Sequence, residues 1–368
     1  MNSTMSPSGF RRQLGQLVML GFSGYDVPPE VRALARDFDI GGIVLFRRNV
    51  ESPEQVAALA YECARLCETL PAWVAVDQEG GRVARLRAPF TEWPPMAALG
   101  HAGDEALASR FARAMARELA AVGITFDFAP VLDVLTNPAN PAIGDRAIGG
   151  RADVVSRIGC AIIDALQSEG IAACGKHFPG HGDASVDSHH DLPVLDLPPD
   201  RFEAVDWVPF RAAIARSVAG IMVAHVLVPA FDEREPASLS RTIVHGLLRE
   251  RLGFGNLILT DDLSMKGCSG RHDPPAATVL AIAAGHDSAL LCEPNHDDQA
   301  AALESLVRAY ESGTLPFAQL EASVARHARL KARFAGPRAR AGRPSEAWRD
   351  VVGCEAHQAL AVEMRQHV

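Results

Sequence analysis

The chain has 368 residues, of which 48% are hydrophobic and 22% charged, so it is long enough for one large core or for two ordinary domains. Its 36 basic and 45 acidic side chains give a net charge of −9, which argues against a nucleic-acid partner and offers no attraction to an anionic membrane surface. The seven cysteines, an odd number scattered mostly through apolar runs, favour reduced core thiols in a cytoplasmic protein over a disulfide framework.

Eight short apolar runs recur along the chain and predict β-strands. They are residues 17–22, 42–46, 73–77, 124–130, 172–178, 220–225, 257–262 and 287–292. Most are apolar throughout, as is typical of parallel strands buried on both faces. The first follows Arg11 and Arg12 but reads directly as a strand and lacks a small-residue cleavage site, so we expect no signal peptide. No run is long enough to span a bilayer.

Amphipathic segments between the runs predict helices. The clearest is 152–168, where apolar residues recur at spacings of three and four; others are 52–68, 104–121, 205–217, 241–251 and 275–284. Strands alternating with helices predict an α/β fold, a single (β/α)8 barrel of the TIM type, in preference to a doubly wound open sheet. The reason is that polar residues end several runs, and a barrel gathers these ends around one mouth whereas an open sheet spreads them apart.

Helical patterns also follow the last run, at 296–313, 317–334 and 346–364. The Gly/Pro/Arg-rich stretch GPRARAGRPSEA separates the second of these helices from the third. We therefore expect a barrel domain over 1–335, followed over 336–368 by a linker and a helical tail that is too short to form a second domain.

Two adjacent aspartates, Asp261 and Asp262, end the seventh run. Neighbouring residues of a strand point to opposite sides, so one can face the barrel mouth while the other packs outside it. A carboxylate at the mouth would serve as a nucleophile or a charge stabiliser. On this motif alone, capping of the next helix by Asp262 or Ser264 is an equally good interpretation.

The third run ends at Asp77 and leads into a Gly-Gly turn followed by arginines, among them Arg85. An aspartate there can accept hydrogen bonds from neighbouring sugar hydroxyls, and an arginine can bind carboxylate or hydroxyl acceptors. We interpret Arg82 and Arg87 as surface residues. Arg146, in the Gly/Pro-rich loop after the fourth run, would be able to reach the mouth, although this signal is weak by itself.

The densest polar cluster is KHFPGHGDASVDSHHD, residues 176–191. Lys176 and His177 end the fifth run, and the rest forms a long loop suited to closing over a substrate. A plain surface loop does not explain four histidines, so two interpretations remain. In one, Asp187 orients His189 as an acid and base near neutral pH, opposite a carboxylate on another strand. In the other, four side chains bind zinc: His177, His181, Asp183 and His189.

Taken together, these motifs resemble glycoside hydrolase family 3. The matching segments are GQLVMLGF, GGIVLF, VDQEGGRV, IGDR, KHFPGHGD with DSH, LTDDLSMKG and AGHD, which run from residue 14 to residue 292. Within the family, the chain is similar to bacterial β-N-acetylglucosaminidases that recycle cell-wall muropeptides. That branch often consists of single-barrel enzymes of about this length, which agrees with the barrel predicted from the alternating pattern.

The resemblance assigns roles to individual residues. The nucleophile falls on Asp261, and the acid/base falls on His189 with Asp187 as its partner. Substrate contacts fall on five residues: Asp77, Arg85, Arg146, Lys176 and His177. His190 extends the motif to DSHH, so a second imidazole competes with His189, and whether it shares the role is open.

The resemblance implies retaining hydrolysis of terminal β-linked N-acetylglucosamine from glycosides of the GlcNAc-anhydroMurNAc type. We expect a cytoplasmic monomer with no metal, no cofactor, and no nucleic-acid or membrane partner. Three alternatives remain open. They are a metal-dependent hydrolase that uses the His/Asp cluster at 177–190, a family 3 phosphorylase with phosphate as acceptor, and a catalytically idle sugar-binding module.

Overall fold

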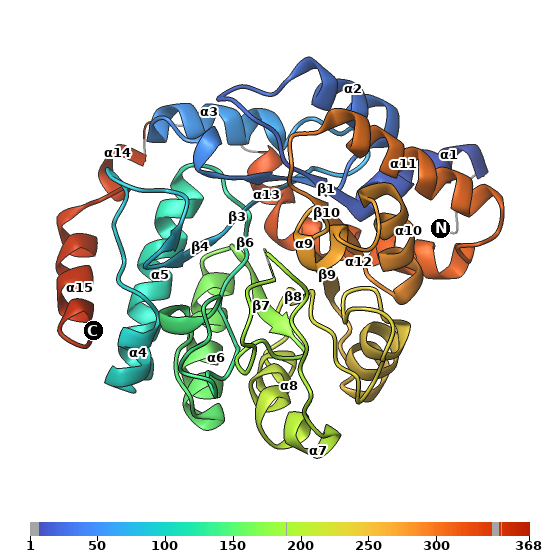
Figure 1. Cartoon of the computed structure of the whole chain (residues 1–368). Coiled ribbons are helices and arrows are strands. Elements are labelled where there is room, and N and C mark those ends of the chain that lie inside the picture. Colours follow the sequence, from blue (N-terminus) through green and yellow to red (C-terminus); the bar gives the residue numbers. More distant parts are fainter. Residues whose placement is uncertain (1–6, 189, 341–345, 347) are drawn as a thin grey trace.

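Eight parallel strands form a closed barrel (Figure 1) in the order β1-β10-β9-β8-β7-β6-β3-β2. This computed structural model describes residues 7–188, 190–340, 346 and 348–368. The strands are β1 (Val18–Leu20), β2 (Gly42–Leu45), β3 (Trp73–Val76), β6 (Phe126–Asp127), β7 (Ala172–Phe178), β8 (Gly220–Val223), β9 (Leu257–Asp262) and β10 (Ser288–Leu291). Each coincides with one predicted apolar run, and the (β/α)8 barrel is confirmed.

Alternating residues of each strand fill two separate apolar regions. In β3, Trp73 and Ala75 face the barrel interior, whereas Val74 and Val76 pack toward the surrounding helices. Small residues make room for the large interior rings: a Cβ on Gly220 would lie 2.9 Å from the ring of Phe126. The two-residue period of a strand therefore explains why the runs are apolar on both faces.

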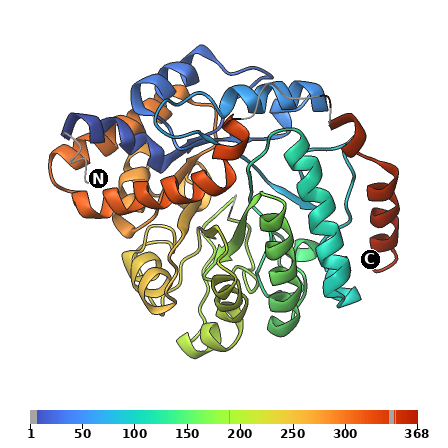
Figure 2. The ribbon, with the colours of Figure 1, turned by 180° about the vertical axis from the view of Figure 1, so that it is seen from behind.

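Helices form the outer ring around the barrel (Figures 1 and 2). Those that follow strands are α2 (Pro29–Phe38), α3 (Pro53–Cys63), α4 (Ala97–Ala102), α5 (Glu105–Ala121), α6 (Ala152–Ser168), α7 (Pro199–Arg201), α8 (Trp207–Ala215), the π-helical segment η5 (Thr242–Arg251), α9 (Lys266–Ser269), α10 (Pro274–Ala284) and α11 (His296–Glu311). The sequence pattern did not predict α2, in which only Val31, Leu34 and Ala35 are buried. None of the described helices is both long and apolar enough to cross a membrane. All seven cysteines are unpaired, and five are buried.

The chain beyond the barrel differs from the single terminal helix that was predicted at 346–364. After α12 (Phe317–Phe334), the predicted linker begins with the short helix α13 (Gly336–Arg340). The terminal helix is split into α14 (Trp348–Val351) and α15 (Glu355–Arg365). The break lies at Gly353, which has φ +62° and approaches the backbone of a distant loop so closely that a Cβ would lie 2.1 Å from the Pro89 oxygen.

The C-terminal segment packs against the side of the barrel, where α15 lies beside α5 in both views (Figures 1 and 2). The buried Glu118 of α5 accepts hydrogen bonds from His357 Nδ1 (2.8 Å) and from the Gly353 backbone N–H (3.0 Å). Arg110 and Glu363 form an exposed ion pair farther along the same helices. The division into a barrel domain and a tail at residue 335 stays a prediction.

The N-terminal end of the barrel is closed by α12, which places a buried lysine against the barrel wall. Lys331 is fully buried, and its Nζ donates to Gln16 Oε1 (2.6 Å) and to the Gly41 carbonyl (2.7 Å). His327, one turn earlier, accepts a hydrogen bond from Trp73 Nε1 at 3.2 Å. Burial lowers the pKa of Lys331 to about 7, although Cys67 and Asp39 nearby oppose the shift.

This lowered pKa predicts that part of the stability depends on pH. Below pH of about 7 both the folded and the unfolded chain hold the Lys331 proton, but between about 7 and 10.4 only the unfolded chain does, so the free energy of unfolding rises with pH. We therefore compare the free energy of unfolding of wild type with that of Lys331→Met, measured by urea unfolding at two pH values. From pH 7.5 to pH 9.5, wild type should gain about 2 kcal/mol relative to Lys331→Met. Lys266→Met, at an exposed lysine, should show no such change, and parallel curves for Lys331→Met would contradict the prediction.

Candidate active site

Several of the predicted site residues meet at the C-terminal mouth of the barrel. Lys176 and His177 are two of the last three residues of β7. Asp77 directly follows β3, and Asp261 is the penultimate residue of β9. They line two adjoining cavities of about 360 Å³ and 200 Å³, which share Asp77, Arg85, Met222 and Asp261. The larger cavity lies in the roughly 300–1,000 Å³ range of small-molecule sites.

Four of the five predicted substrate-contact residues belong to one buried ion cluster. Lys176 Nζ lies 2.6 Å from Glu79 Oε1 and 2.8 Å from Asp77 Oδ1. Arg85 Nη2 binds the second Asp77 oxygen at 3.1 Å. Arg146 forms a bidentate pair with Glu79 through Nε (2.9 Å) and Nη2 (2.8 Å). Positive and negative groups therefore alternate along the wall of the smaller cavity.

The cluster keeps its members ionised in spite of their burial. Burial alone would raise the pKa of Asp77, but Lys176 and Arg85 outweigh it and hold this pKa well below the ordinary value. Burial likewise opposes the effect of Arg146 and Lys176 on Glu79, whose pKa falls to about 2. Burial lowers the pKa of Lys176, yet Asp77 and Glu79 raise it above the ordinary value. The wall thus offers charged donors and acceptors together, as recognition of several hydroxyl groups requires.

Glu79 was not among the predicted site residues, although it lies at the centre of the cluster. It is 1% exposed and belongs to β4 (Gln78–Gly80), which pairs with β5 (Val83–Ala84) in a hairpin after β3. In extended chain, residues two apart share a side, so Asp77 and Glu79 point the same way. That spacing is the signal that would have identified Glu79.

A second buried carboxylate, Asp133, holds His177 in place. Its Oδ2 lies 2.8 Å from His177 Nδ1, and its Oδ1 accepts the His181 backbone N–H at 2.7 Å. Because a carboxylate can only accept, Nδ1 of His177 carries a proton, and Nε2 is the ring nitrogen that stays available to a ligand. Burial would raise the pKa of Asp133, but His177 and His181 reverse the shift and lower it. Asp133 follows β6 in no recognisable motif, so it could not be predicted from the sequence.

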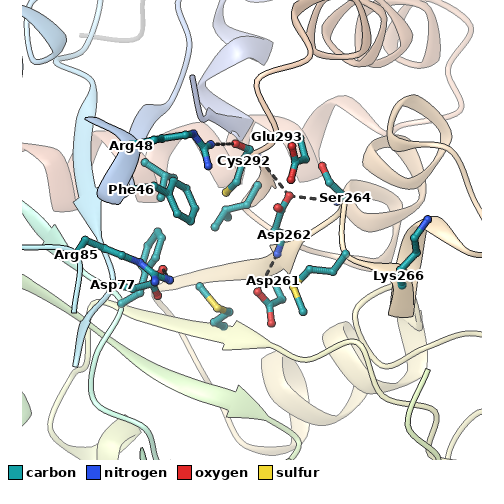
Figure 3. Close-up of a pocket in the computed structure, with 15 residues that line it drawn as sticks. Phe46, Arg48, Asp77, Arg85, Asp261, Asp262, Ser264, Lys266, Cys292 and Glu293 are labelled. Carbon is teal, nitrogen blue, oxygen red and sulfur yellow. Dashed lines mark hydrogen bonds and ion pairs between the residues drawn. The ribbon is translucent and has the colours of Figure 1, made fainter. Parts of the chain in front are cut away.

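The two adjacent aspartates of β9 have different roles. Figure 3 shows Asp261 and Asp262 on one side of the larger cavity, with Asp77 and Arg85 on the opposite side. Asp262 accepts backbone N–H groups of Ser264 (3.1 Å) and Cys292 (3.0 Å), so it holds the following turn against the end of β10. Burial raises the pKa of Asp262 to about 6. The capping interpretation is wrong, because the N-cap residue of α9 is Met265 and no side chain caps this helix. Asp262 instead stabilises the turn before α9, whereas Asp261 lines both cavities.

The histidine-rich loop also contributes residues to the smaller cavity. Asp187 and Ser188 line this cavity, and the Ser188 carbonyl accepts the Gly267 N–H (3.0 Å) from the turn after β9. His190 is exposed. His189, the predicted acid/base, lies outside the described residues.

The zinc interpretation receives no support from the described part of this loop. Asp183 accepts a hydrogen bond from Thr136 Oγ1 at 2.8 Å. Among the described residues, no three His, Cys, Asp or Glu side chains are grouped so that they would hold a metal ion, and this includes His177, His181 and Asp183.

A parallel barrel whose mouth carries carboxylates, paired cations and an oriented histidine has the chemistry of an enzyme that acts on polyhydroxyl substrates. The sequence profile of the Glycosyl hydrolase family 3 N terminal domain matches residues 10–330, and the chain belongs to this family of glycoside hydrolases. This confirms the family resemblance of the sequence motifs.

Individual relatives agree with this assignment. The β-hexosaminidase of Thiobacillus denitrificans is 40% identical over 293 residues, which cover 78% of this chain and 80% of that protein. The structure of a family 3 β-N-acetylglucosaminidase from Paenibacillus sp. superposes with a TM-score of 0.93 at 38% identity, over 99% of this chain and 69% of the other. NagZ from Neisseria gonorrhoeae gives a TM-score of 0.77 at 31% identity, over 95% and 97% of the two chains.

The ion cluster predicts that Glu79 is needed for both stability and activity. In Glu79→Gln, the two buried cations Lys176 and Arg146 lose the carboxylate between them, so we expect a loss of about 3 kcal/mol in the free energy of unfolding. Displacement of these side chains should also lower kcat/KM by about a hundredfold. Urea unfolding and hydrolysis of an aryl glycoside measure the two effects.

The matched control is Glu105→Gln, which removes the carboxylate of an exposed pair with Arg157. Solvent screens this pair, so the variant should lose less than about 1 kcal/mol and keep its activity. Equal effects for the two variants would contradict a special role of Glu79.

Proposed function

We propose that this glycoside hydrolase is a β-N-acetylhexosaminidase that releases terminal β-linked N-acetylglucosamine with retention of configuration. The observation that carries the proposal is the position of Asp261, which lines both cavities at the end of β9 and lies across the larger one from Asp77 and Arg85 (Figure 3). The names of the relatives, β-hexosaminidase and β-N-acetylglucosaminidase, support the choice of sugar.

In the first step, the Asp261 carboxylate attacks the anomeric carbon while the bond to the leaving oxygen breaks, and a covalent glycosyl ester forms. The Asp262 backbone N–H donates to Asp261 Oδ1 at 2.9 Å and so limits rotation of the carboxylate. The same backbone is held from behind, because His225 Nε2 donates to the Asp262 carbonyl at 2.9 Å. These contacts support a nucleophile that is oriented before the substrate binds.

The acid/base in the proposal is His189, oriented by Asp187. The protonated imidazole donates its proton to the leaving oxygen, then takes a proton from the water that attacks the ester and frees Asp261. Most retaining glycosidases use a carboxylic acid here, whereas a histidine needs a carboxylate to fix its tautomer and stabilise the imidazolium. The bond from Gly267 to the Ser188 carbonyl supports this role, because it ties the loop to the turn that follows Asp261.

The remaining site residues bind the sugar in this proposal. Asp77 accepts hydrogen bonds from hydroxyl groups, and Lys176, Arg85 and Arg146 donate them; His177 contributes its Nε2. We place the natural substrate among muropeptide glycosides of the GlcNAc-anhydroMurNAc type, as the similarity to NagZ supports. We further propose that the enzyme acts as a cytoplasmic monomer without metal or cofactor.

The nucleophile can be tested with Asp261→Ala. Loss of the attacking carboxylate should lower kcat for an activated aryl β-N-acetylglucosaminide by about 10⁴-fold or more. Added azide should restore aryl release and yield the α-configured glycosyl azide, since azide would then attack the carbon directly. Asp262→Asn keeps the acceptor oxygen for both backbone N–H groups and should retain far more activity. Wild-type rates in Asp261→Ala would reject the proposal.

The acid/base can be tested by the choice of leaving group. His189→Ala should slow an alkyl or sugar leaving group by at least about a hundredfold, but a dinitrophenyl leaving group much less, because only the former needs a proton. His190→Ala is the matched control and should affect neither strongly. Equal losses on both substrates would exclude His189 as the acid, and a selective loss in His190→Ala would reassign the role. Repeating the assays with chelator and with phosphate should leave the rate and the free sugar product unchanged.

A further inference from the structure

One polar side chain near Asp261 has no role in the proposed mechanism. His181 is 2% exposed, and neither of its ring nitrogens has a hydrogen-bond partner among the described residues. Every other buried histidine that the structure describes has at least one ring nitrogen bonded. A buried polar group without a hydrogen-bond partner is destabilising, so the two unpartnered nitrogens of His181 point to a ligand that would bind them.

The backbone around His181 is fixed on both sides. Its N–H donates to Asp133 Oδ1 and its carbonyl accepts from Asn140 Nδ2, each at 2.7 Å. Gly182 lies so close to the preceding strand connection that a Cβ would be 1.9 Å from the Val134 oxygen. The ring is therefore held in place without any hydrogen bond from its own nitrogens.

The ring is also placed where a substrate would meet it. His181 lines the smaller cavity together with Asp261, Asp187 and Arg146, and packs edge-on against His177 with 5.9 Å between ring centroids. His177 is already committed to Asp133 through Nδ1. His181 is thus the histidine of this wall whose hydrogen-bonding capacity is not used by the described protein.

We propose that His181 is a further substrate-binding residue, which hydrogen-bonds a neutral polar group of the sugar bound beside Asp261. Burial lowers the pKa of His181 even though Asp133 opposes the shift, so the ring is neutral at pH 7, with one donor and one acceptor nitrogen. That pair suits a hydroxyl or an amide better than an ion. The inference rests on the proposed function, because it requires that the smaller cavity hold the sugar.

The physical consequence is selectivity for the group that His181 meets. The buried His181 imidazole has no contact with water, so it gains a hydrogen bond when a sugar with the matching polar group binds. When the sugar lacks that group, the imidazole stays unpaired. His181 is therefore expected to discriminate between sugars that differ at one position.

The experiment pairs His181→Phe, which keeps an aromatic ring without hydrogen bonds, with four aryl β-glycosides. Each glycoside lacks one polar group of N-acetylglucosamine, namely the acetamido group or the hydroxyl at C3, C4 or C6. On the complete substrate, we expect kcat/KM to fall about tenfold to a hundredfold. On one of the four analogues, wild type and variant should differ less than about threefold, because the partner group is already absent.

Two further variants keep the result interpretable. His181→Gln can still donate and accept, and should recover part of the loss. His286→Phe is the matched control, because His286 is also buried with an unpartnered Nε2 but does not line either cavity; its kcat/KM should stay at the wild-type value. If His181→Phe does not fold, the same analogue series is run on His181→Leu, which also removes both ring nitrogens, and ¹⁵N NMR of histidine-labelled wild type should show the imidazole signal that is absent from His181→Gln shifting on saturation with N-acetylglucosamine.

An equal loss on all four analogues, or no imidazole shift, would overturn the inference. The failure of the proposed function would look different, since Asp261→Ala would then retain activity on the complete substrate. If Asp261→Ala is inactive while His181→Phe behaves like wild type, only the role of His181 is rejected.

Discussion

The mouth of this barrel depends on one buried contact, the Glu79 carboxylate between Lys176 and Arg146. The three groups come from the hairpin after β3, from the end of β7, and from the loop that precedes α6. Since the segments are far apart in the sequence, the cluster can form only when the barrel has closed. Folding and the assembly of the substrate wall are in this way the same event.

Such a cluster is better explained by orientation than by stability. Removing several charges from water is costly, and a buried pair often contributes little net stability compared with apolar residues of the same size. The ion pairs instead give the side chains defined positions. Each cation is bound by a carboxylate, and each carboxylate is in turn bound by a second cation. Asp133 and Asp262 do the same for His177 and for the turn after Asp261. Most reactive groups at the mouth thus have a second buried group that fixes them.

The parts of this arrangement that could be predicted are those that depend on local pattern. The eight apolar runs identified the strands, and a polar residue at the end of a run identified Asp77, Lys176 and Asp261. Glu79 was not predicted because it lies two residues past the predicted run that ends at Asp77, beside glycines that are typical of a turn. Asp133 was not predicted because it follows an apolar stretch and belongs to no motif.

The remaining differences arise from contacts between distant segments. The helical pattern over 346–364 is real, but the break at Gly353 is imposed by the Pro89 backbone, which no local pattern can reveal. The same holds for His181: its residue type was noticed in the cluster, but its lack of partners is a property of the surrounding walls.

The distribution of lysine has a practical consequence. The chain has three lysines, and the fold buries two of them, Lys176 in the ion cluster and Lys331 at the base of the barrel. The third, Lys266, is exposed and lines the larger cavity, where Figure 3 shows it beyond Ser264 and away from Asp77. Apart from the amino terminus, an amine-directed fluorophore would therefore find a single lysine side chain on the folded enzyme. Because Lys266 lies at the rim of the larger cavity, the fluorescence of the labelled native chain should report ligand binding, and no engineered cysteine is needed.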